Sequence, residues 1–271
     1  MCGILLGIIH DNADRGLLRL ARRDIDRAMS ALDARGGDSW GLTSSGGASY
    51  QLRLSGLGMY SAGGTVPLLV PGSVVVGHTR FATRGAVHIG NAHPFQHLGY
   101  SVAHNGGYFA DIPDDTWADC DSHALTGYIA RAINTGRDVV LPSGGYGTVA
   151  AGDGDGLGYV WRSGGQCHAV RRPWGMLVTS VPVDGLTGAA VSVPDDETVR
   201  VYDSHGACAD VARVTLRPAP RWTASPARGK GRSSRGGAVE RGWSTCLACR
   251  SASLDCEGGV CRDCLSAWEH V

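Results

Sequence analysis

The 271-residue chain has few of the features that mark secreted, membrane-bound or nucleic-acid-binding proteins. Basic and acidic residues balance at 25 each, so the formal charge gives no general sign of binding to nucleic acid or to a membrane surface. No apolar run approaches the ~20 residues that a membrane-spanning helix needs. The apolar start lacks a basic leading segment and soon meets Asp11 and Asp14, which does not fit a secretory signal. We therefore expect a cytoplasmic protein.

Phenylalanine is also scarce, with 3 residues, whereas glycine is abundant, with 41. This balance favours many turns and short strands over long helices. The nine cysteines are an odd number, and four of them form two Cys-x-x-Cys pairs. This usage indicates thiol and metal chemistry in a reducing compartment rather than a disulfide framework.

The periodicity of apolar residues predicts two helices among many short strands. Helical spacing extends over residues 15–34, and a second helix fits 121–135, with Asp121-Ser122 as its N-cap and Gly136 beyond its end. Strands are expected at residues 2–9, 38–42, 48–54, 73–79, 100–104, 146–151, 157–162, 167–171, 175–181, 197–203 and 211–216. Over residues 1–216 we therefore expect an α+β sandwich whose sheets are covered by helices.

The composition changes sharply after residue 216. Residues 217–242 contain three prolines and seven basic residues against one acid. Such a segment has too little apolar surface to order itself, so we expect a flexible basic linker. We expect residues 243–271 to form a separate cysteine-rich module.

The module holds two Cys-x-x-Cys pairs that are eleven residues apart, namely Cys246 with Cys249 and Cys261 with Cys264. This spacing supplies four thiolates that close a tetrahedron around zinc at about 2.3 Å. Because the module is too short for a core of its own, the metal would supply most of its folding energy. We predict a structural Zn²⁺ in a zinc ribbon, with Cys256 or His270 as alternative ligands. Docking onto a partner protein is its expected role, and nucleic-acid binding is the alternative.

Cys2 follows a methionine that is normally removed when the next residue is small. Removal would leave Cys2 with a free α-amine beside its thiol, and an amine that titrates at about pH 8 can act as the base for a nucleophile. The simpler interpretation is that Cys2 begins a buried strand, because free cysteine is among the most buried residue types.

Polar residues and glycines gather in four places where a strand or helix is expected to end. Taken singly, each has a simpler explanation, such as a solvated charge or a hairpin turn. The four stretches are Arg35-Gly36-Gly37-Asp38-Ser39-Trp40-Gly41, residues 77–85, Asn91-Ala92-His93-Pro94-Phe95 and His104-Asn105-Gly106-Gly107.

In this order, between Met1-Cys2-Gly3-Ile4 and the helix that begins at Asp121, these stretches resemble the class II glutamine amidotransferases. The resemblance extends over residues 2–216. It implies the four-layer αββα sandwich of the N-terminal-nucleophile hydrolases. It also implies that Cys2 attacks the carboxamide of glutamine and forms a γ-glutamyl thioester, with its α-amine carrying the proton. Asn105 and Gly106 would form the oxyanion hole.

The resemblance also implies how the substrate is held. Arg80 would bind the α-carboxylate of glutamine with two parallel hydrogen bonds, and Asp121 would bind the α-ammonium. The chemistry of a free amino acid supports this pairing independently of the resemblance. A substrate carboxylate or ammonium that is desolvated and left unpaired costs free energy. Thr83 and His93 would line the same pocket.

Three further residues near these stretches have other expected roles. Arg35 and Asp38 are expected to hold the loop that frames Cys2 rather than to touch substrate. Arg84 departs from the family, because some members have a histidine there. We expect this difference to change contacts with glutamine or with an acceptor domain.

After residue 216 the chain has no phosphate-binding glycine loop and no sugar-phosphate site that would use ammonia. The first interpretation is a glutaminase subunit that delivers ammonia to a separate synthetase or carboxylate-amine ligase. The second is a γ-glutamyl amide or peptide hydrolase that uses the same cysteine. A degenerate domain kept for binding is the third.

Overall fold

The computed structural model describes residues 2–46, 51–63, 66–108, 120–141 and 144–216, together with four two-residue strands near the C-terminus. The chain divides into two compact units, Met1–Ala219 and Pro220–Val271. None of the helices in the described ranges is long and apolar enough to cross a membrane.

In the second unit the described backbone forms two short antiparallel pairs. These are β14 (Ser244–Thr245) with β15 (Ala252–Ser253), and β16 (Cys256–Glu257) with β17 (Val260–Cys261). The expected linker at 217–242 and the predicted zinc ligands Cys246, Cys249 and Cys264 lie outside the described residues. For Cys261 the structure describes only the backbone, so the zinc site stays a prediction.

The first unit contains a six-stranded antiparallel sheet in the order β10-β11-β1-β4-β2-β3. Its strands are β1 (Gly3–Ile9), β2 (Ser39–Ser45), β3 (Gln51–Leu57), β4 (Val74–Arg80), β10 (His168–Arg172) and β11 (Gly175–Thr179). The N-terminal strand β1 thus lies in the middle of its sheet, between β4 and β11. Its first residue, Gly3, is opposite Thr79 near the end of β4.

A second sheet of seven strands has the order β5-β6-β8-β9-β12-β13-β7. Its strands are β5 (Phe95–His97), β6 (Tyr100–Tyr108), β7 (Val139–Leu141), β8 (Gly145–Gly152), β9 (Gly158–Ser163), β12 (Thr198–Tyr202) and β13 (Cys208–Leu216). All neighbours are antiparallel except β13 and β7, which are parallel.

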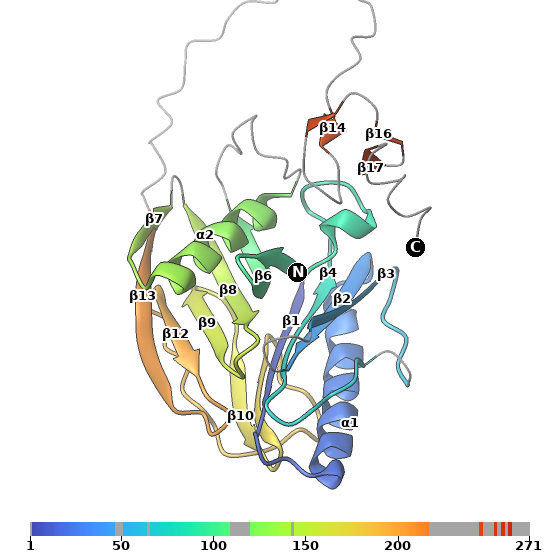
Figure 1. Cartoon of the computed structure of the whole chain (residues 1–271), viewed down its shortest axis with the longest axis vertical. Helices are drawn as coiled ribbons and strands as arrows, with labels where there is room; N and C mark the ends of the chain where they lie inside the picture. Colours follow the sequence, from blue (N-terminus) through green and yellow to red (C-terminus); the bar gives the residue numbers. More distant parts are fainter. Residues whose placement is uncertain are drawn as a thin grey trace, which may run out of the picture. The chain divides into compact units, whose positions relative to one another are not determined.

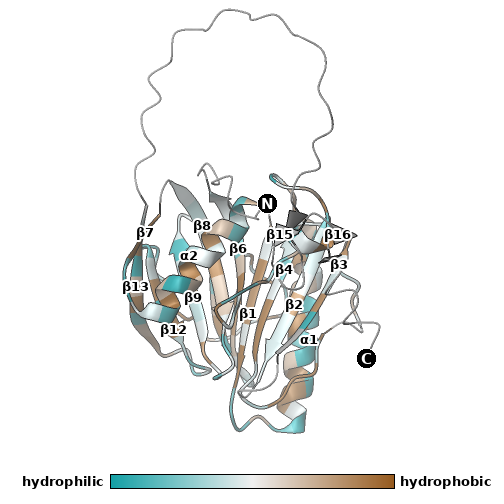
Figure 2. Ribbon diagram, turned by 45° about the horizontal axis from the view of Figure 1, so that its top comes forward, coloured by the Kyte–Doolittle hydropathy of each residue, from teal (hydrophilic) through white to brown (hydrophobic). Residues whose placement is uncertain are grey.

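One helix covers each sheet, α1 (Arg15–Leu32) on the first and α2 (Asp121–Thr135) on the second (Figure 1). The apolar side of α1 packs against the first sheet, and Figure 2 shows apolar and polar stretches along this helix. Asp14 caps its start, where its Oδ1 accepts a hydrogen bond from the Leu17 N–H at 2.8 Å.

A separate hydrophobic core lies where the two sheets face each other. It joins apolar side chains of β1 and β4 to those of β6, β8, β9 and β12. Successive side chains of β1 point to opposite faces, so Leu5 packs toward α1 and Ile4 and Leu6 pack toward the second sheet. Because β1 is buried on both faces and paired on both edges, the backbone that follows Cys2 is firmly held.

The expected α+β class, with two helices among many strands, is confirmed. The prediction that Asp121-Ser122 caps α2 is wrong. Cys120 holds the N-cap position, and Asp121 is the first helical residue. Its Oδ1 accepts a hydrogen bond from the neighbouring Ser122 N–H at 2.9 Å. Gly136 ends the helix in the left-handed region, with φ 60°. Strands β5 and β7 are not predicted by the sequence, because three residues are too few to show an alternating pattern.

Candidate active site

Cys2 lies directly before β1, beside the end of β4 (Figure 1). Its Sγ accepts a hydrogen bond from the Phe81 N–H at 3.4 Å and contacts the Phe81 carbonyl oxygen at 3.5 Å. Asp38 fixes the loop after β4, since its Oδ2 accepts from the Ala82 N–H at 2.7 Å and its own N–H donates to the Arg80 carbonyl at 3.0 Å. Asp38 therefore holds the loop around Cys2, as expected.

A pocket of about 710 Å³ opens beside Cys2. Its size is typical of small-molecule sites, which measure roughly 300–1,000 Å³. The residues that line it are Cys2, Arg35, Phe81, Thr83, Arg84, Asn105, Gly106, Gly107, Tyr108, Asp121, Tyr146, Gly147, Gly164, Gly165 and Gln166. The fold thus brings together five of the seven predicted catalytic and substrate-binding residues, namely Cys2, Thr83, Asn105, Gly106 and Asp121. Arg80 and His93 do not line the pocket.

Burial raises the pKa of the Cys2 thiol above its usual value. The Phe81 N–H and the Arg80 guanidinium act in the opposite direction, but their effect is smaller. At neutral pH the sulfur therefore carries its proton, and a base must remove that proton before the sulfur can attack a carbonyl carbon.

Asn105 and Gly106 lie next to each other in β6, where β6 pairs with β8. Gly106 is opposite Gly147, and both have positive φ, at 154° and 140°. A Cβ on Gly106 would collide with the Tyr146 carbonyl, and one on Gly147 would collide with the Asn105 carbonyl. Only glycine fits at these two positions, and its small size keeps this side of the pocket open.

Strand β6 is hydrogen-bonded to the first turn of α2 both before and after Asn105 and Gly106. His104 Nδ1 and Ser122 Oγ share a hydrogen bond at 3.0 Å, and His104 Nε2 lies 3.3 Å from the Tyr146 carbonyl oxygen. Beyond the pair, the Tyr108 N–H donates to Asp121 Oδ2 at 3.2 Å. The sequence placed Ser122 only in the expected N-cap and His104 only in one of the polar stretches. Their contact could not be predicted, because only the fold brings α2 against this strand.

Arg80 is 2% exposed, and its guanidinium is directed into the loop that follows β4. It donates hydrogen bonds to the carbonyl oxygens of Arg84 at 2.7 Å, Ala86 at 3.0 Å and Gly85 at 3.4 Å. The contacts recorded for Arg80 therefore organise this loop.

His93 is buried away from the pocket. Its ring stacks on that of His78, with centroids 4.0 Å apart, and lies 4.3 Å from that of Phe95. Neither of its ring nitrogens has a hydrogen-bond partner among the described residues. Burial lowers the pKa of His93 well below its usual value, so the ring is neutral and packs as an apolar group.

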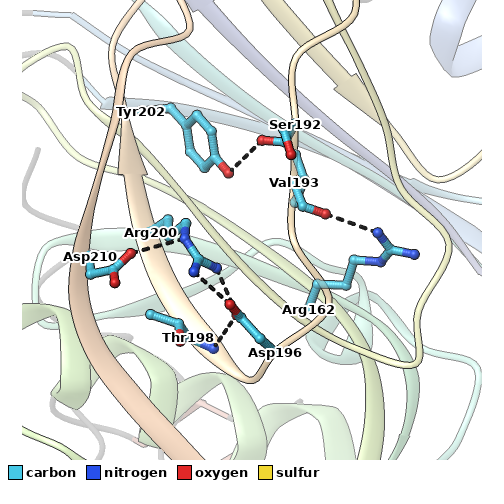
Figure 3. A network of polar contacts seen from close by, with 8 residues as sticks. All are labelled: Arg162, Ser192, Val193, Asp196, Thr198, Arg200, Tyr202 and Asp210. Carbon is cyan, nitrogen blue, oxygen red and sulfur yellow. Dashed lines mark hydrogen bonds and ion pairs between the residues drawn. The ribbon is translucent and has the colours of Figure 1, made fainter.

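The wall that includes Gly164 and Gly165 is held by residues from distant segments. Arg162 Nε donates to the Gly165 carbonyl at 2.6 Å, and its Nη1 donates to the Val193 carbonyl at 2.9 Å (Figure 3). The Gly164 N–H donates to Asp195 Oδ1 at 2.7 Å. Arg162 and Asp195 thereby fix the course of this wall.

Arg35 reaches the same wall from the other side. Its Nη1 donates to Gln166 Oε1 at 2.8 Å and to the Ser180 carbonyl at 3.0 Å. The sequence predicted a loop-holding role for Arg35, whereas here it lines the pocket. Gln166 was missed, because no pattern in the sequence links residue 166 to the motifs.

In the ranges that the structure describes, no three histidine, cysteine or acidic side chains form a group that could hold a metal ion. Because free cysteine is among the most buried residue types, Cys120, Cys167 and Cys208 are expected to pack in the core. Cys120 is buried and Cys167 is partly buried, but Cys208 is exposed on β13, so the expectation is wrong for Cys208.

No protein-family model matches the chain. A segment of 109 residues is 35% identical to the glutamine–fructose-6-phosphate aminotransferase [isomerizing] of Acidithiobacillus ferridurans. That segment makes up 39% of this chain and 16% of the relative, so the match spans only a small part of that protein.

Two solved structures are similar to 78% of this chain at 13% identity, and in each the similarity covers 48% of the solved chain. One is a glutamine phosphoribosylpyrophosphate amidotransferase from B. subtilis in complex with ADP and GMP, with a TM-score of 0.44. The other is described as the allosteric regulatory enzyme of purine biosynthesis, with a TM-score of 0.53. This chain therefore shares with the second structure a fold of mixed sheets with few helices.

Proposed function

We propose that this chain is a glutamine amidohydrolase of the class II amidotransferase type, with Cys2 as an N-terminal nucleophile. The observation that carries the proposal is that Cys2, Asn105, Gly106 and Asp121 line one pocket although they come from three separate parts of the fold, namely the start of β1, β6 and the start of α2. The packing of one helix outside each of two facing sheets supports the four-layer αββα fold of N-terminal-nucleophile hydrolases. The sequence similarity to a glutamine–fructose-6-phosphate aminotransferase supports glutamine as the substrate.

In this proposal the Cys2 sulfur attacks the carboxamide carbon of glutamine, and its thiol proton passes to the α-amine of Cys2, directly or through one water. The raised pKa of the thiol supports the need for that base. The Asn105 side-chain amide and the Gly106 N–H donate hydrogen bonds to the oxygen that becomes negative. When the carbon–nitrogen bond breaks, the amine returns its proton to the departing ammonia. Water then cleaves the thioester, which releases glutamate and restores Cys2.

Asp121 would bind the α-ammonium of the substrate. Its side chain is 7% exposed and lines the pocket. Each oxygen accepts one backbone hydrogen bond, from the Ser122 N–H and the Tyr108 N–H, and a carboxylate has further acceptor capacity. Both of these contacts also fix its orientation toward the pocket.

A γ-glutamyl amide or peptide hydrolase is the second candidate. It is favoured by the size of the pocket, about 710 Å³, and by five glycines in its lining, which add no side chains to it. These residues are Gly106, Gly107, Gly147, Gly164 and Gly165. Such a site has room for a leaving group larger than ammonia, and the acylation step on Cys2 would be the same.

The direct experiment incubates the purified chain with glutamine and measures glutamate and ammonia. Wild type should release both, and Cys2→Ala should release neither. A glutamine-analogue electrophile should add its mass to the N-terminal peptide of wild type only. Active enzyme whose intact mass still includes Met1 would rule out the N-terminal mechanism. A strong preference for γ-glutamyl peptides over glutamine would favour the second candidate.

We also propose that the ammonia is used by a separate synthetase or carboxylate-amine ligase. The support is that residues 217–271 carry no phosphate-binding glycine loop of the kind that an ammonia-using synthetase would need. Faster glutamine hydrolysis on adding that partner would support this assignment, and glutaminase activity indifferent to every candidate ligase would count against it.

For the C-terminal module we propose a structural zinc ion held by Cys246, Cys249, Cys261 and Cys264. The support is the donor set itself, four thiolates in two paired knuckles. The backbone register of β16 and β17 puts Cys256 opposite Cys261, so Cys256 remains an alternative ligand. Metal analysis should find about one zinc per chain. Replacing Cys246 and Cys261 together by serine should remove it, and unchanged zinc content would disprove these ligands.

A further inference from the structure

Helix α1 lies on the outside of the first sheet and presents a series of arginines to solvent (Figure 1). Its buried side is mainly apolar, whereas five arginines are exposed, namely Arg15, Arg19, Arg22, Arg23 and Arg27. All of them except Arg22 follow one another at intervals of four residues and form a row about 18 Å long, at the helical rise of ~1.5 Å per residue. We call these five residues the arginine stripe.

Carboxylates do not neutralise the arginine stripe. No ion pair within the described ranges includes any of its arginines. Three aspartates cap α1 or belong to it, and each already accepts a hydrogen bond from another group; they are Asp14, Asp24 and Asp26. The exposed side of α1 therefore carries net positive charge, although the formal charge of the whole chain is zero.

This arrangement works against the stability of the helix itself. Like charges four residues apart repel each other across one turn, and the stripe contains three such pairs. The first turn holds Arg15 but no acid, so a positive charge also lies at the positive end of the helix dipole. A conflict of this kind between local sequence and local structure is typical of a functional surface.

The chemistry of α1 favours nucleic acid over the other anionic partners. An interface with a protein normally has apolar or aromatic anchors at its centre, and the large apolar residues found exposed in the described chain all lie outside α1. Stable attachment to a membrane uses an apolar face, and that of α1 is buried against the sheet. Binding to the phosphates of nucleic acid needs neither feature, because it depends on positive charge.

We propose that the arginine stripe binds the phosphate backbone of double-stranded nucleic acid. Proteins that bind single strands stack the bases on aromatic side chains, and α1 contains none. Planar guanidinium groups suit phosphates, which they bind with two parallel hydrogen bonds. The sequence holds a second basic stretch, residues 217–242, with seven basic residues against one acid. No arginine of the stripe lines the pocket beside Cys2, so this binding does not depend on the proposed catalysis.

The test measures binding of the full chain to a fluorescent duplex of about 20 base pairs by anisotropy, between about 50 and 200 mM salt. Wild type should bind, and its affinity should fall steeply with salt. Arg19→Gln/Arg23→Gln should lower the affinity at low salt by about 10-fold or more. It should also reduce the slope of log affinity against log salt by about 2, because two phosphate contacts are lost.

Arg131→Gln/Arg137→Gln is the matched control. It removes two exposed arginines in and just beyond α2, so affinity and slope should both stay at the wild-type values. Glutamine has a helix propensity close to that of arginine and relieves the repulsion, so Arg19→Gln/Arg23→Gln should have a thermal midpoint equal to or above that of wild type. If that midpoint falls, Arg15→Gln/Arg27→Gln gives the same comparison at the two ends of the row.

Duplex DNA and duplex RNA carry the same phosphates, and a comparison of the two shows which one the stripe prefers. Equal affinities of wild type and the stripe variants would show that another part of the chain binds the duplex. Tighter binding to polyglutamate, to vesicles with anionic lipid or to a single strand would overturn the assignment in favour of that partner. Lack of wild-type binding to either duplex at about 50 mM salt would disprove the proposal outright.

Discussion

Asn105 is nearly buried, and its side chain lines the pocket beside Cys2. If its amide stabilises the oxyanion, Asn105→Ala should lower kcat by about 10²–10³-fold and change KM little, because the contact strengthens only in the transition state. Steady-state kinetics with glutamine measure this. Alkylation of Cys2 by iodoacetamide serves as the control and should proceed in the variant. A raised KM with normal kcat would instead make Asn105 a ground-state binding residue.

Ser122 and His104 form a buried hydrogen bond that holds the strand of Asn105 and Gly106 against α2. Ser122→Ala should lower the free energy of unfolding by about 1–3 kcal/mol, because the buried His104 Nδ1 loses its partner. It should also reduce kcat, since Asn105 follows His104 directly. Urea unfolding and glutamine kinetics test the two effects.

Ser30→Ala is the matched control for Ser122→Ala. Its hydroxyl bonds the Asp26 carbonyl on the exposed side of α1, so both stability and kcat should be nearly unchanged. If Ser122→Ala lowers the free energy of unfolding but leaves kcat normal, the hydrogen bond has only a structural role.

Single-residue roles show where sequence reasoning succeeds and where it stops. Cys2, Asn105 and Asp121 stand in motifs that resemble those of a known family, and that resemblance, rather than periodicity, predicted that they share one site. The directions of the Arg80 and Arg84 side chains could not be predicted, because Arg80 ends β4 and Arg84 lies in the loop that follows it. Which guanidinium faces the pocket depends on the path of the loop carbonyls, and no periodic pattern records that path.

At the scale of elements, the wall after β9 depends on Arg162 (Figure 3). Arg162→Ala removes the bonds to the Gly165 and Val193 carbonyls, so the wall should loosen. We expect KM for glutamine to rise by about fivefold or more, since each hydrogen bond is worth about 1 kcal/mol. The kcat should change less, because this wall holds none of the reacting groups.

Arg200→Ala is the comparison for Arg162→Ala, since Arg200 bonds Asp196 and Asp210 in the same network but does not line the pocket. It should leave KM near the wild-type value. Equal KM values in Arg162→Ala and wild type would show that the wall keeps its shape without the guanidinium.

Helix α1 is fastened to the first sheet by a buried carboxylate. Asp24 Oδ2 accepts hydrogen bonds from Arg172 Nη2 at 2.9 Å and from Trp174 Nε1 at 2.7 Å, and Asp24 is 6% exposed. Asp24→Ala should lower the free energy of unfolding by about 3–5 kcal/mol, because it leaves a buried guanidinium without its partner. Urea unfolding followed by circular dichroism measures this.

Asp210→Ala provides the contrast to Asp24→Ala. Asp210 also pairs with an arginine, but its side chain is 70% exposed, and surface pairs contribute about 0–1 kcal/mol. If both substitutions cost the same, burial would not be what gives the Asp24 contact its strength.

The helices and most strands were predictable because each is a local pattern. The order of the strands within each sheet could not be predicted from the sequence. β1 pairs with β4 and β11, which are about 70 and 170 residues away in the sequence, and such pairings depend on the whole fold rather than on local periodicity.

At the scale of the molecule, three buried histidines make stability depend on pH. They are His78, His93 and His104, and burial lowers the pKa of each, that of His78 to about 3 from 6.5. Above pH 6.5 these rings are neutral in both states and contribute no pH dependence. Below it the unfolded chain takes up protons that the folded protein does not, until pH reaches about 3 for His78.

The free energy of unfolding should therefore fall as pH decreases from about 6.5, by up to about 1.4 kcal/mol per pH unit for each of these histidines. Urea unfolding between about pH 7 and pH 5, above the range of most carboxylates, measures the slope. The exposed His168 provides the control, since His168→Gln should leave the slope unchanged. A flat profile in this range would mean that these rings accept protons in the folded state.

The place of Cys2 at the head of a central strand has a consequence for how the enzyme is made. Two neighbouring strands fix the backbone from Gly3 onward, and Cys2 itself lines the pocket. Any residue joined ahead of Cys2 would block the amine that serves as base and would compete with glutamine for space. In the proposed mechanism an aminopeptidase therefore switches the enzyme on, and a purification tag belongs at the other end of the chain.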